Sequence, residues 1–140
     1  MIEISTDKSK LNINVIHKYL SEESYWAKDR NIETIQRSID HSLCFGVYIN
    51  DNQVGFARVV TDYTIYAYIM DVFILKEYQG KGYGKSLMNA IMNHQELQNL
   101  NRWGLATNDA HGLYKQFGFE SLSKPEIMME IKKKQPITEK

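Results

Sequence analysis

The residues best suited to binding a ligand form a glycine turn, Gln79-Gly80-Lys81-Gly82-Tyr83-Gly84. Glycine lets the backbone approach a ligand closely and adopt conformations that other residues avoid. The turn lies between a β-rich run and an amphipathic helix that we expect over residues 83–98. Free N–H groups at the start of that helix, together with its dipole, would attract an anion, and Lys81 and Lys85 add positive charge. The turn therefore predicts a site for a phosphate or a pyrophosphate.

Two other phosphate-binding turns fit the sequence poorly. A dinucleotide fold requires Gly-x-Gly-x-x-Gly after an early strand, whereas this chain has Gly-x-Gly-x-Gly in its middle. A P-loop ends in Gly-Lys-Ser, as at Gly84-Lys85-Ser86, but it requires glycine at position 79, where this chain has glutamine. The remaining alternative is a glycine turn that binds no ligand.

Two motifs resemble those of one family. Gln79, Gly82 and Gly84 match Gln/Arg-x-x-Gly-x-Gly/Ala, the coenzyme A pyrophosphate motif of the GNAT superfamily of N-acetyltransferases. The sequence AHGLYKQFGF at residues 110–119 is similar to the second GNAT signature, A-x-x-L-Y-x-x-x-G-F. The motifs come in the family's order, and the resemblance in element order covers nearly the whole chain, although residues 1–40 carry no motif. The resemblance implies an enzyme that moves an acetyl group from acetyl-CoA directly to a primary amine, through a ternary complex.

By the same resemblance, acetyl-CoA would lie where two central parallel strands splay apart, here residues 66–75 and 103–107. The backbone of Val72, Phe73 and Ile74 would pair with the pantetheine arm and polarise the acetyl carbonyl. Where the family has an asparagine, Thr107 or its neighbour Asn108 would hold the pantetheine amide, unless the two only cap the following helix. The pyrophosphate would bind the amides of Gln79, Gly80, Lys81, Gly82, Tyr83, Gly84 and Lys85.

The reaction requires a base for the protonated amine, a hydrogen-bond donor for the oxyanion and an acid for the departing thiolate. The resemblance implies that Tyr114, the tyrosine of the second signature, is the acid; the alternative is a core aromatic. Asp71 is the only carboxylate in residues 66–75, where many relatives carry a glutamate near the position of Tyr68. We predict Asp71 as base or substrate anchor, with an ion pair to Arg58 as the alternative. His111 and a chain of water molecules are rival bases.

The acceptor amine is not identified by the sequence. Tyr25 and Trp26 lie in the loop that walls the acceptor pocket in the family, although they could equally pack on the sheet. Arg58 could bind an acceptor carboxylate. The second hypothesis is a non-catalytic acyl-CoA-binding sensor or regulator on the same fold, against which Tyr114 argues. A nucleotide hydrolase comes third, because the P-loop is incomplete.

Composition limits the partners. The 140 residues carry 17 basic and 17 acidic side chains, so the basic excess typical of nucleic-acid binding is missing. His17, His41 and His94 are isolated, which predicts no metal site.

No apolar stretch approaches the roughly 20 residues that span a membrane, and no signal peptide is recognisable. The single cysteine, Cys44, fits a reducing compartment, so we expect a cytoplasmic protein. The resemblance also favours a homodimer.

The pattern of apolar residues predicts one domain over residues 1–140, with a frayed tail from 132 to 140. We expect the α/β (α+β) class, as a mostly antiparallel sheet flanked by helices. The predicted strands cover residues 2–4, 43–49, 54–60, 64–75, 103–107, 119–122 and 127–131. The predicted helices start at residue 12 and cover residues 32–43, 83–98 and 110–117, with Asn31 as an N-cap.

Overall fold

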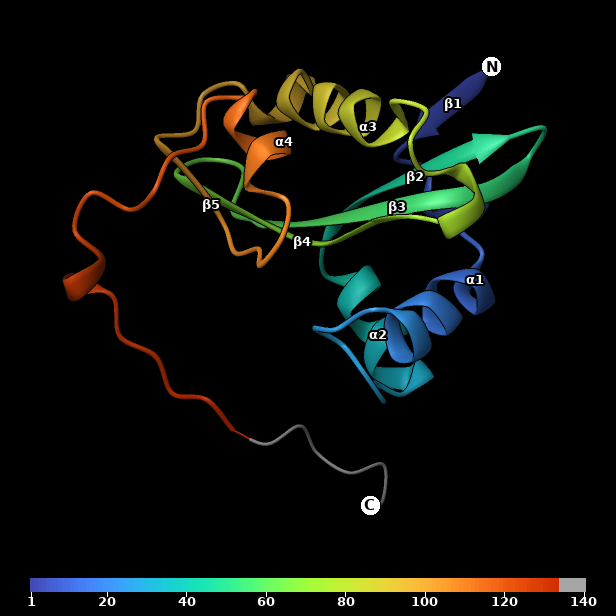
Figure 1. Ribbon diagram of the computed structural model, residues 1–140, viewed down its shortest axis with the longest axis horizontal. Helices are drawn as coiled ribbons and strands as arrows, with labels where there is room; N and C mark the ends of the chain where they lie inside the picture. The colour runs from blue at the N-terminus through green and yellow to red at the C-terminus, as the bar shows by residue number, and fades with distance from the viewer. Residues whose placement is uncertain (134–140) are drawn as a thin grey trace.

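A five-stranded mixed sheet forms the centre of the protein, in a computed structural model that describes residues 1–133 (Figure 1). The strands lie in chain order across the sheet, and the first three pairs of neighbouring strands are antiparallel. Only the last pair, β4 with β5, is parallel. The expected fold class is thus confirmed. The strands are β1 (Ile2–Ser5), β2 (Leu43–Ile49), β3 (Asn52–Thr61), β4 (Tyr66–Ile74) and β5 (Arg102–Leu105).

Helices cover both faces of the sheet, and each face has its own buried cluster. Figure 1 shows α3 (Tyr83–Met92) and α4 (His111–Lys115) on one face, and α1 (Ile13–Lys18) and α2 (Ile32–Asp40) on the other. Successive residues of a strand point to opposite faces, so Phe56 packs toward α1 and α2 while Ala57 packs toward α3. The two clusters together hold β3 and β4 in the middle of the molecule.

The loop between α1 and α2 carries several residues of the site described below. Helix α1 continues into a π-helical turn, Tyr19–Glu23, and the chain then leaves the helix at Ser24. The buried Ser24 hydroxyl donates to the Leu20 carbonyl at 2.6 Å and accepts from the Ala27 amide at 3.0 Å, which fixes the loop. The next helix starts as predicted, because the Asn31 side chain accepts from the Thr34 amide at 2.8 Å.

A β-bulge separates the second half of β4 from β5. Pairing between the two parallel strands ends at Ile69 and Leu105, whereas β4 continues along β3 as far as Ile74. The β3–β4 register shifts after Phe56, so that Ala57 faces two residues of β4 instead of one. Asp71 lies at this shift with a positive φ of 58°. Since a bulge bends its strand and increases the local twist, it accounts for the gap between β4 and β5.

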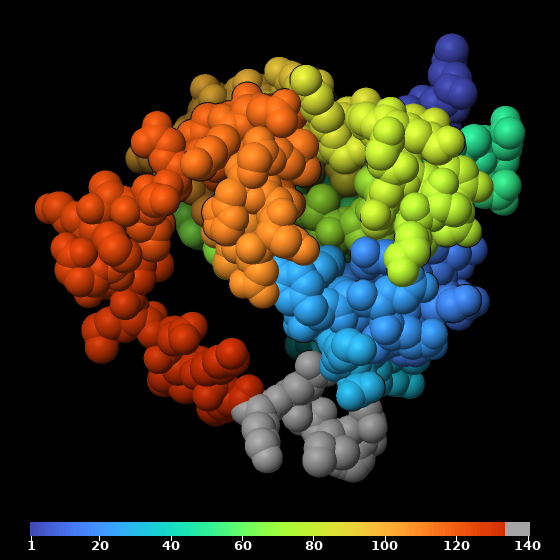
Figure 2. All heavy atoms as spheres, in the orientation of Figure 1, coloured from blue at the N-terminus to red at the C-terminus, as the bar shows by residue number. Residues whose placement is uncertain are grey.

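Two predicted strands at the C-terminal end are wrong. After α4 the described chain contains no strand at residues 119–122 or 127–131, only a 3-10 turn at Pro125–Ile127. A strand forms only where a neighbouring strand supplies hydrogen bonds, and this segment leads away from the body (Figures 1 and 2).

Three smaller predictions are also corrected or limited. The helix expected over residues 83–98 ends at Met92, because the Asn93 side chain donates to the Asn89 carbonyl at 2.9 Å and closes the last turn. Leu43 belongs to β2 and not to α2. The predicted tail lies outside the described residues from position 134 onward. Within residues 1–133, no helix has both the length and the apolar character needed to cross a membrane.

Candidate active site

The glycine turn has the geometry of an anion site. Gly80 and Gly82 have φ values of 81° and 84°, a left-handed conformation that favours glycine. Gly82 is also the N-cap of α3 and offers no side chain to its first turn. The first helical hydrogen bond comes from the Ser86 amide, which donates to the Gly82 carbonyl at 3.0 Å. Within residues 1–133, the amides from position 80 to position 85 donate to no protein group.

These free amides, with the positive end of the α3 dipole and the exposed side chains of Lys81 and Lys85, fit a pyrophosphate. The Gln79 side chain makes a hydrogen bond to the protein backbone. Its Nε2 donates to the Ile74 carbonyl at 2.8 Å, so it links the glycine turn to the end of β4. The structure thus joins the turn directly to the strand half that has no β5 neighbour.

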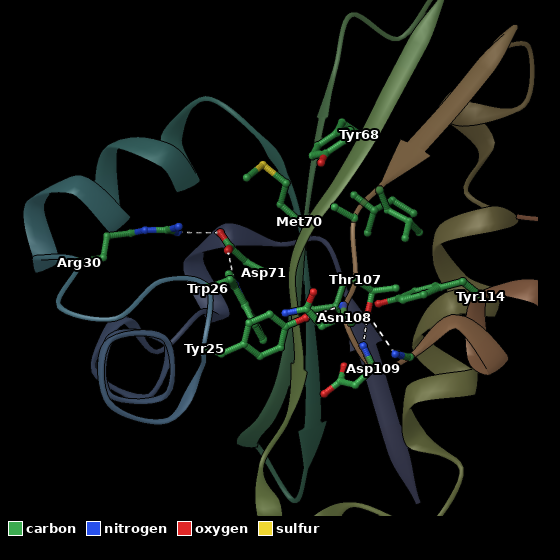
Figure 3. A pocket seen from close by; sticks show the side chains of 15 residues that line it. Tyr25, Trp26, Arg30, Tyr68, Met70, Asp71, Thr107, Asn108, Asp109 and Tyr114 are labelled. Atoms are coloured by element: carbon green, nitrogen blue, oxygen red, sulfur yellow. Dashed lines mark hydrogen bonds and ion pairs between the residues drawn. The ribbon is translucent and has the colours of Figure 1, made fainter. Parts of the chain in front are cut away.

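A cavity of about 320 Å³ lies at the gap between β4 and β5 (Figure 3). Three segments far apart in sequence supply its wall: the loop after α1, the middle of β4, and the turn from β5 into α4. Most of the predicted catalytic and substrate residues meet here. The lining residues are Tyr25, Trp26, Arg30, Tyr68, Ile69, Met70, Asp71, Val72, Leu105, Ala106, Thr107, Asn108, Asp109, Ala110 and Tyr114.

Asp71 is fully engaged in hydrogen bonds and ion pairs. Its side chain is buried; Oδ1 accepts from Trp26 Nε1 at 2.9 Å. Oδ2 accepts from Arg58 Nε at 2.8 Å and from Arg30 Nη1 at 3.1 Å. Arg58 also donates to the Ser42 hydroxyl at 3.1 Å. This is the ion-pair alternative left open by the sequence, and it favours a positioning role for Asp71 at the bulge. Its action as a base stays a prediction.

Tyr25 ties the loop after α1 to the end of β5. Its hydroxyl accepts from the Asn108 amide at 2.9 Å, and its ring lies edge-on to Trp26 with centroids 5.0 Å apart. Trp26 in turn holds Asp71 on β4. The two aromatic residues therefore connect the two sides of the gap, as Figure 3 shows.

Tyr114 presents its hydroxyl to the cavity. Tyr114 as a whole is 9% exposed, and Figure 3 shows its ring pointing from α4 toward Thr107. Burial raises the pKa of the Tyr114 phenol, and the nearby Tyr25 and Asp109 raise this pKa further. The phenol thus keeps its proton at neutral pH. No hydrogen bond of this hydroxyl is found in the described part of the chain, so the proton can be given to a ligand.

The turn before α4 carries Thr107, which was predicted, and Asp109, which sequence reasoning missed. The Thr107 hydroxyl accepts from the amides of Asp109 and Ala110 at 3.3 and 3.1 Å, so it caps the turn. Asp109 lines the cavity, and it forms no ion pair in the part of the chain that is described. Neither Asp109 nor Arg30 stands in a motif, and their places depend on contacts across the fold. Residues 1–133 contain no group of three or more His, Cys, Asp or Glu side chains able to hold a metal ion.

A family model, a curated relative and two solved structures all point to the same protein family. A model described as "Acetyltransferase (GNAT) domain" matches residues 40–121. A solved GNAT-family protein from Xanthomonas campestris pv. campestris is 50% identical, with a TM-score of 0.92 over 94% of this chain and 93% of that one. A GNAT-family acetyltransferase from Streptococcus pneumoniae is 25% identical, with a TM-score of 0.72 over 97% and 98% of the two chains. A Gibberella zeae relative named as an acetyltransferase is 30% identical, covering 79% of this chain and 74% of the relative.

Proposed function

Because the chain belongs to the GNAT acetyltransferase family, we propose that it transfers the acetyl group of acetyl-CoA to a primary amine. The observation that carries this proposal is the continuity of the glycine turn, the unpaired half of β4 and the cavity. Gln79 links the first two through the Ile74 carbonyl, and Val72 lines the third. An extended ligand with an anionic end and a reactive end fits such a path.

Two parts of the chain bind two different parts of acetyl-CoA. The free amides of residues 80–85 and the two lysines of the turn bind the pyrophosphate. The edge of β4 beyond Ile69, which has no strand partner on the β5 side, binds the pantetheine arm through its backbone. When bound, acetyl-CoA supplies a thioester carbonyl that an amine can attack. A strand N–H group already in place can donate to that carbonyl oxygen without reorganisation.

Tyr114 acts as the general acid in this proposal. Its raised pKa keeps the phenol protonated, and its hydroxyl faces the cavity without a competing partner among residues 1–133. The new bond joins the amine nitrogen to the acetyl carbon, the carbon–sulfur bond breaks, and the phenol proton goes to the sulfur. The nitrogen loses one proton as the amide forms, and that proton restores the phenol, so the products are one amide and one free thiol. Positioned acids of this kind typically contribute about 10²- to 10⁴-fold to the rate.

The acceptor amine enters from the side of Tyr25 and Trp26. Their rings and that of Tyr68 form a largely aromatic wall, which can contact an ammonium group or an apolar body. We assign the binding of the ammonium, and the first step of its deprotonation, to Asp109, because Asp71 is already held by two arginines. Arg58, predicted as a carboxylate ligand, is buried against Asp71 and Ser42, which favours a structural role.

A thiol-release assay tests the proposal. The purified protein is given acetyl-CoA and a panel of amines, namely a polyamine, an amino acid, an aminoglycoside, an arylamine and a peptide with a free N-terminus. We expect turnover with one class, and a loss of about 10²-fold or more in kcat for Tyr114→Phe, which removes only the hydroxyl. Binding of acetyl-CoA without turnover on any amine would instead favour the sensor alternative.

A further inference from the structure

The wall of the cavity holds a positive charge that its protein neighbours do not balance. The guanidinium groups of Arg30 and Arg58 share the single carboxylate of Asp71. Within residues 1–133, no second carboxylate forms an ion pair with either arginine. All three side chains are largely buried, and a buried charge is costly unless an opposite charge accompanies it. The excess of one positive charge therefore requires an anionic ligand.

The excess charge belongs to Arg30 and not to Arg58. Arg58 is buried, and its Nε donates to Asp71. Its Nη1 donates to the Ser42 hydroxyl, and its Nη2 to the Met70 sulfur at 3.4 Å, so all three nitrogens are engaged. Arg30 lines the cavity, and its side chain is 16% exposed (Figure 3). It donates to Asp71 through Nη1 alone, and its Nε and Nη2 have no acceptor among the described residues.

The free edge of the Arg30 guanidinium fits a carboxylate. Nε and Nη2 lie on the same edge of the planar group, where they can donate two parallel hydrogen bonds to the two oxygens of one carboxylate. A carboxylate also brings the one negative charge that balances the excess. A phosphate dianion would bring a second negative charge beside Asp71, in a cavity that Asp109 also lines. Repulsion between like charges therefore favours a carboxylate over a phosphate.

The other walls of the cavity indicate the rest of the ligand. Asp109, assigned above to the ammonium group, lines the cavity and forms no ion pair within residues 1–133. Tyr25, Trp26 and Tyr68 contribute aromatic rings. The Tyr68 ring is held against β5, because it lies over Gly104, where an added Cβ atom would be 3.2 Å from its Cδ1. A ligand with an ammonium group, a carboxylate and an aromatic or apolar body matches all of these walls.

We propose that the acceptor is an amino acid with an aromatic or apolar side chain, and that Arg30 binds its carboxylate. This inference rests on the acetyl transfer proposed above and names its acceptor class. The α-amino nitrogen bonds to the acetyl carbon as the carbon–sulfur bond breaks. The products are an N-acetyl amino acid, the free thiol of CoA and one proton that the ammonium releases to solvent. The carboxylate ligand that the sequence placed at Arg58 is thus assigned to Arg30, which lines the cavity.

Isothermal titration with matched pairs of probes tests the role of the carboxylate. L-phenylalanine, L-leucine and L-methionine are each compared with their amides, which keep the amine and the side chain but lose the negative charge. At pH 6 the amines of both members of a pair are protonated. With saturating CoA, at least one amino acid should bind wild type about 10-fold or more tightly than its amide does. Equal binding within every pair, or no binding of any amino acid, overturns the proposal.

Two arginine variants test whether Arg30 causes the preference. Arg30→Gln should abolish the preference for the acid over the amide. Arg37→Gln, the same change at an exposed arginine of α2, should keep the wild-type ratio of the two dissociation constants. If Arg30 only supported Asp71, Arg30→Gln would weaken the binding of acid and amide equally. A ratio that persists in Arg30→Gln therefore overturns the proposal. Circular dichroism checks that each variant is folded.

Arginine side-chain NMR on wild type covers the case in which Arg30→Gln does not fold. The Nε–H signal of Arg30 is assigned by its loss in Arg30→Lys, which keeps the positive charge. This signal should shift when the amino acid is added and should not respond to the amide. A signal that responds equally to both probes, or to neither, contradicts the assignment.

Thiol release separates this inference from the acetyl transfer itself. With acetyl-CoA, a kcat/KM for the amino acid about 10-fold or more above that for its amide supports both proposals. Turnover of amides or simple amines without a preference for the acid leaves the transfer standing and overturns the amino acid as acceptor. Carboxylate-dependent binding without thiol release would keep Arg30 as a carboxylate ligand, but would overturn the transfer and with it the acceptor role.

Discussion

Replacing Asp71 by asparagine should destabilise the fold by about 3 kcal/mol, because two buried guanidinium groups lose their counter-charge. The side chain of Asp71 is fully buried, and those of Arg58 and Arg30 are 9% and 16% exposed. Removing one partner from a buried ion pair typically costs about 3–5 kcal/mol. We choose the lower end because asparagine still accepts from the Trp26 N–H, tolerates the positive φ of 58°, and leaves Arg30 able to reach water.

Urea unfolding measures this change directly. With an m-value of about 2 kcal/mol/M, the expected loss lowers the midpoint by about 1.5 M. Asp51→Asn is the matched control: Asp51 also has a positive φ, of 68°, but it is exposed and forms no ion pair among the described residues. Its midpoint should stay near that of wild type.

A double-mutant cycle separates the ion pair from other effects of the substitution. Adding Arg58→Met to Asp71→Asn should cost less than the sum of the two single changes, because the unpaired charge has been removed. If Asp71→Asn unfolds within about 0.5 kcal/mol of wild type, the positioning role argued for Asp71 is refuted, since changes of that size are ordinary at the surface.

Three further changes probe the turn, the loop and the core. Gly82→Ala should cost about 1–2 kcal/mol through its left-handed φ, and should weaken acetyl-CoA binding measured by calorimetry. Tyr25→Phe removes the acceptor of the Asn108 amide, and should raise the KM for the amine more than it lowers kcat. Burial raises the pKa of Cys44 from 9.0 to about 11, so native protein should not react with a thiol reagent at pH 8. Because this pKa is raised in the folded state, its stabilisation is present below pH 9 and is lost as pH rises through 11; Cys44→Ala should flatten that alkaline decline in unfolding free energy.

Local signals in the sequence predicted the parts of the fold that local chemistry determines. The glycines at positions 80 and 82 lie where left-handed backbone is needed, and Asn31 caps the helix that it was expected to cap. Tyr114 and Asp71 line the same cavity although 43 residues separate them, as the family resemblance implied. Their catalytic roles remain predictions.

The features that sequence reasoning missed depend on contacts between distant segments. The bulge at Asp71 is a change of register between β3 and β4, and the residues of β4 alone cannot predict it. Arg30 reaches Asp71 from a loop 41 positions away. Residues 119–122 and 127–131 are predicted as strands, but a local sequence pattern cannot say whether a neighbouring strand is present in the same chain.

The glycine turn and the gap beyond it are the proposed binding site for acetyl-CoA. Isothermal titration with acetyl-CoA, beside ATP and NAD, tests it most directly, with Gly82→Ala as the matched variant. We expect one acetyl-CoA bound per chain, weaker binding by the variant, and no response to ATP or NAD. A folded wild-type sample that fails to bind acetyl-CoA, or that prefers ATP, would contradict it.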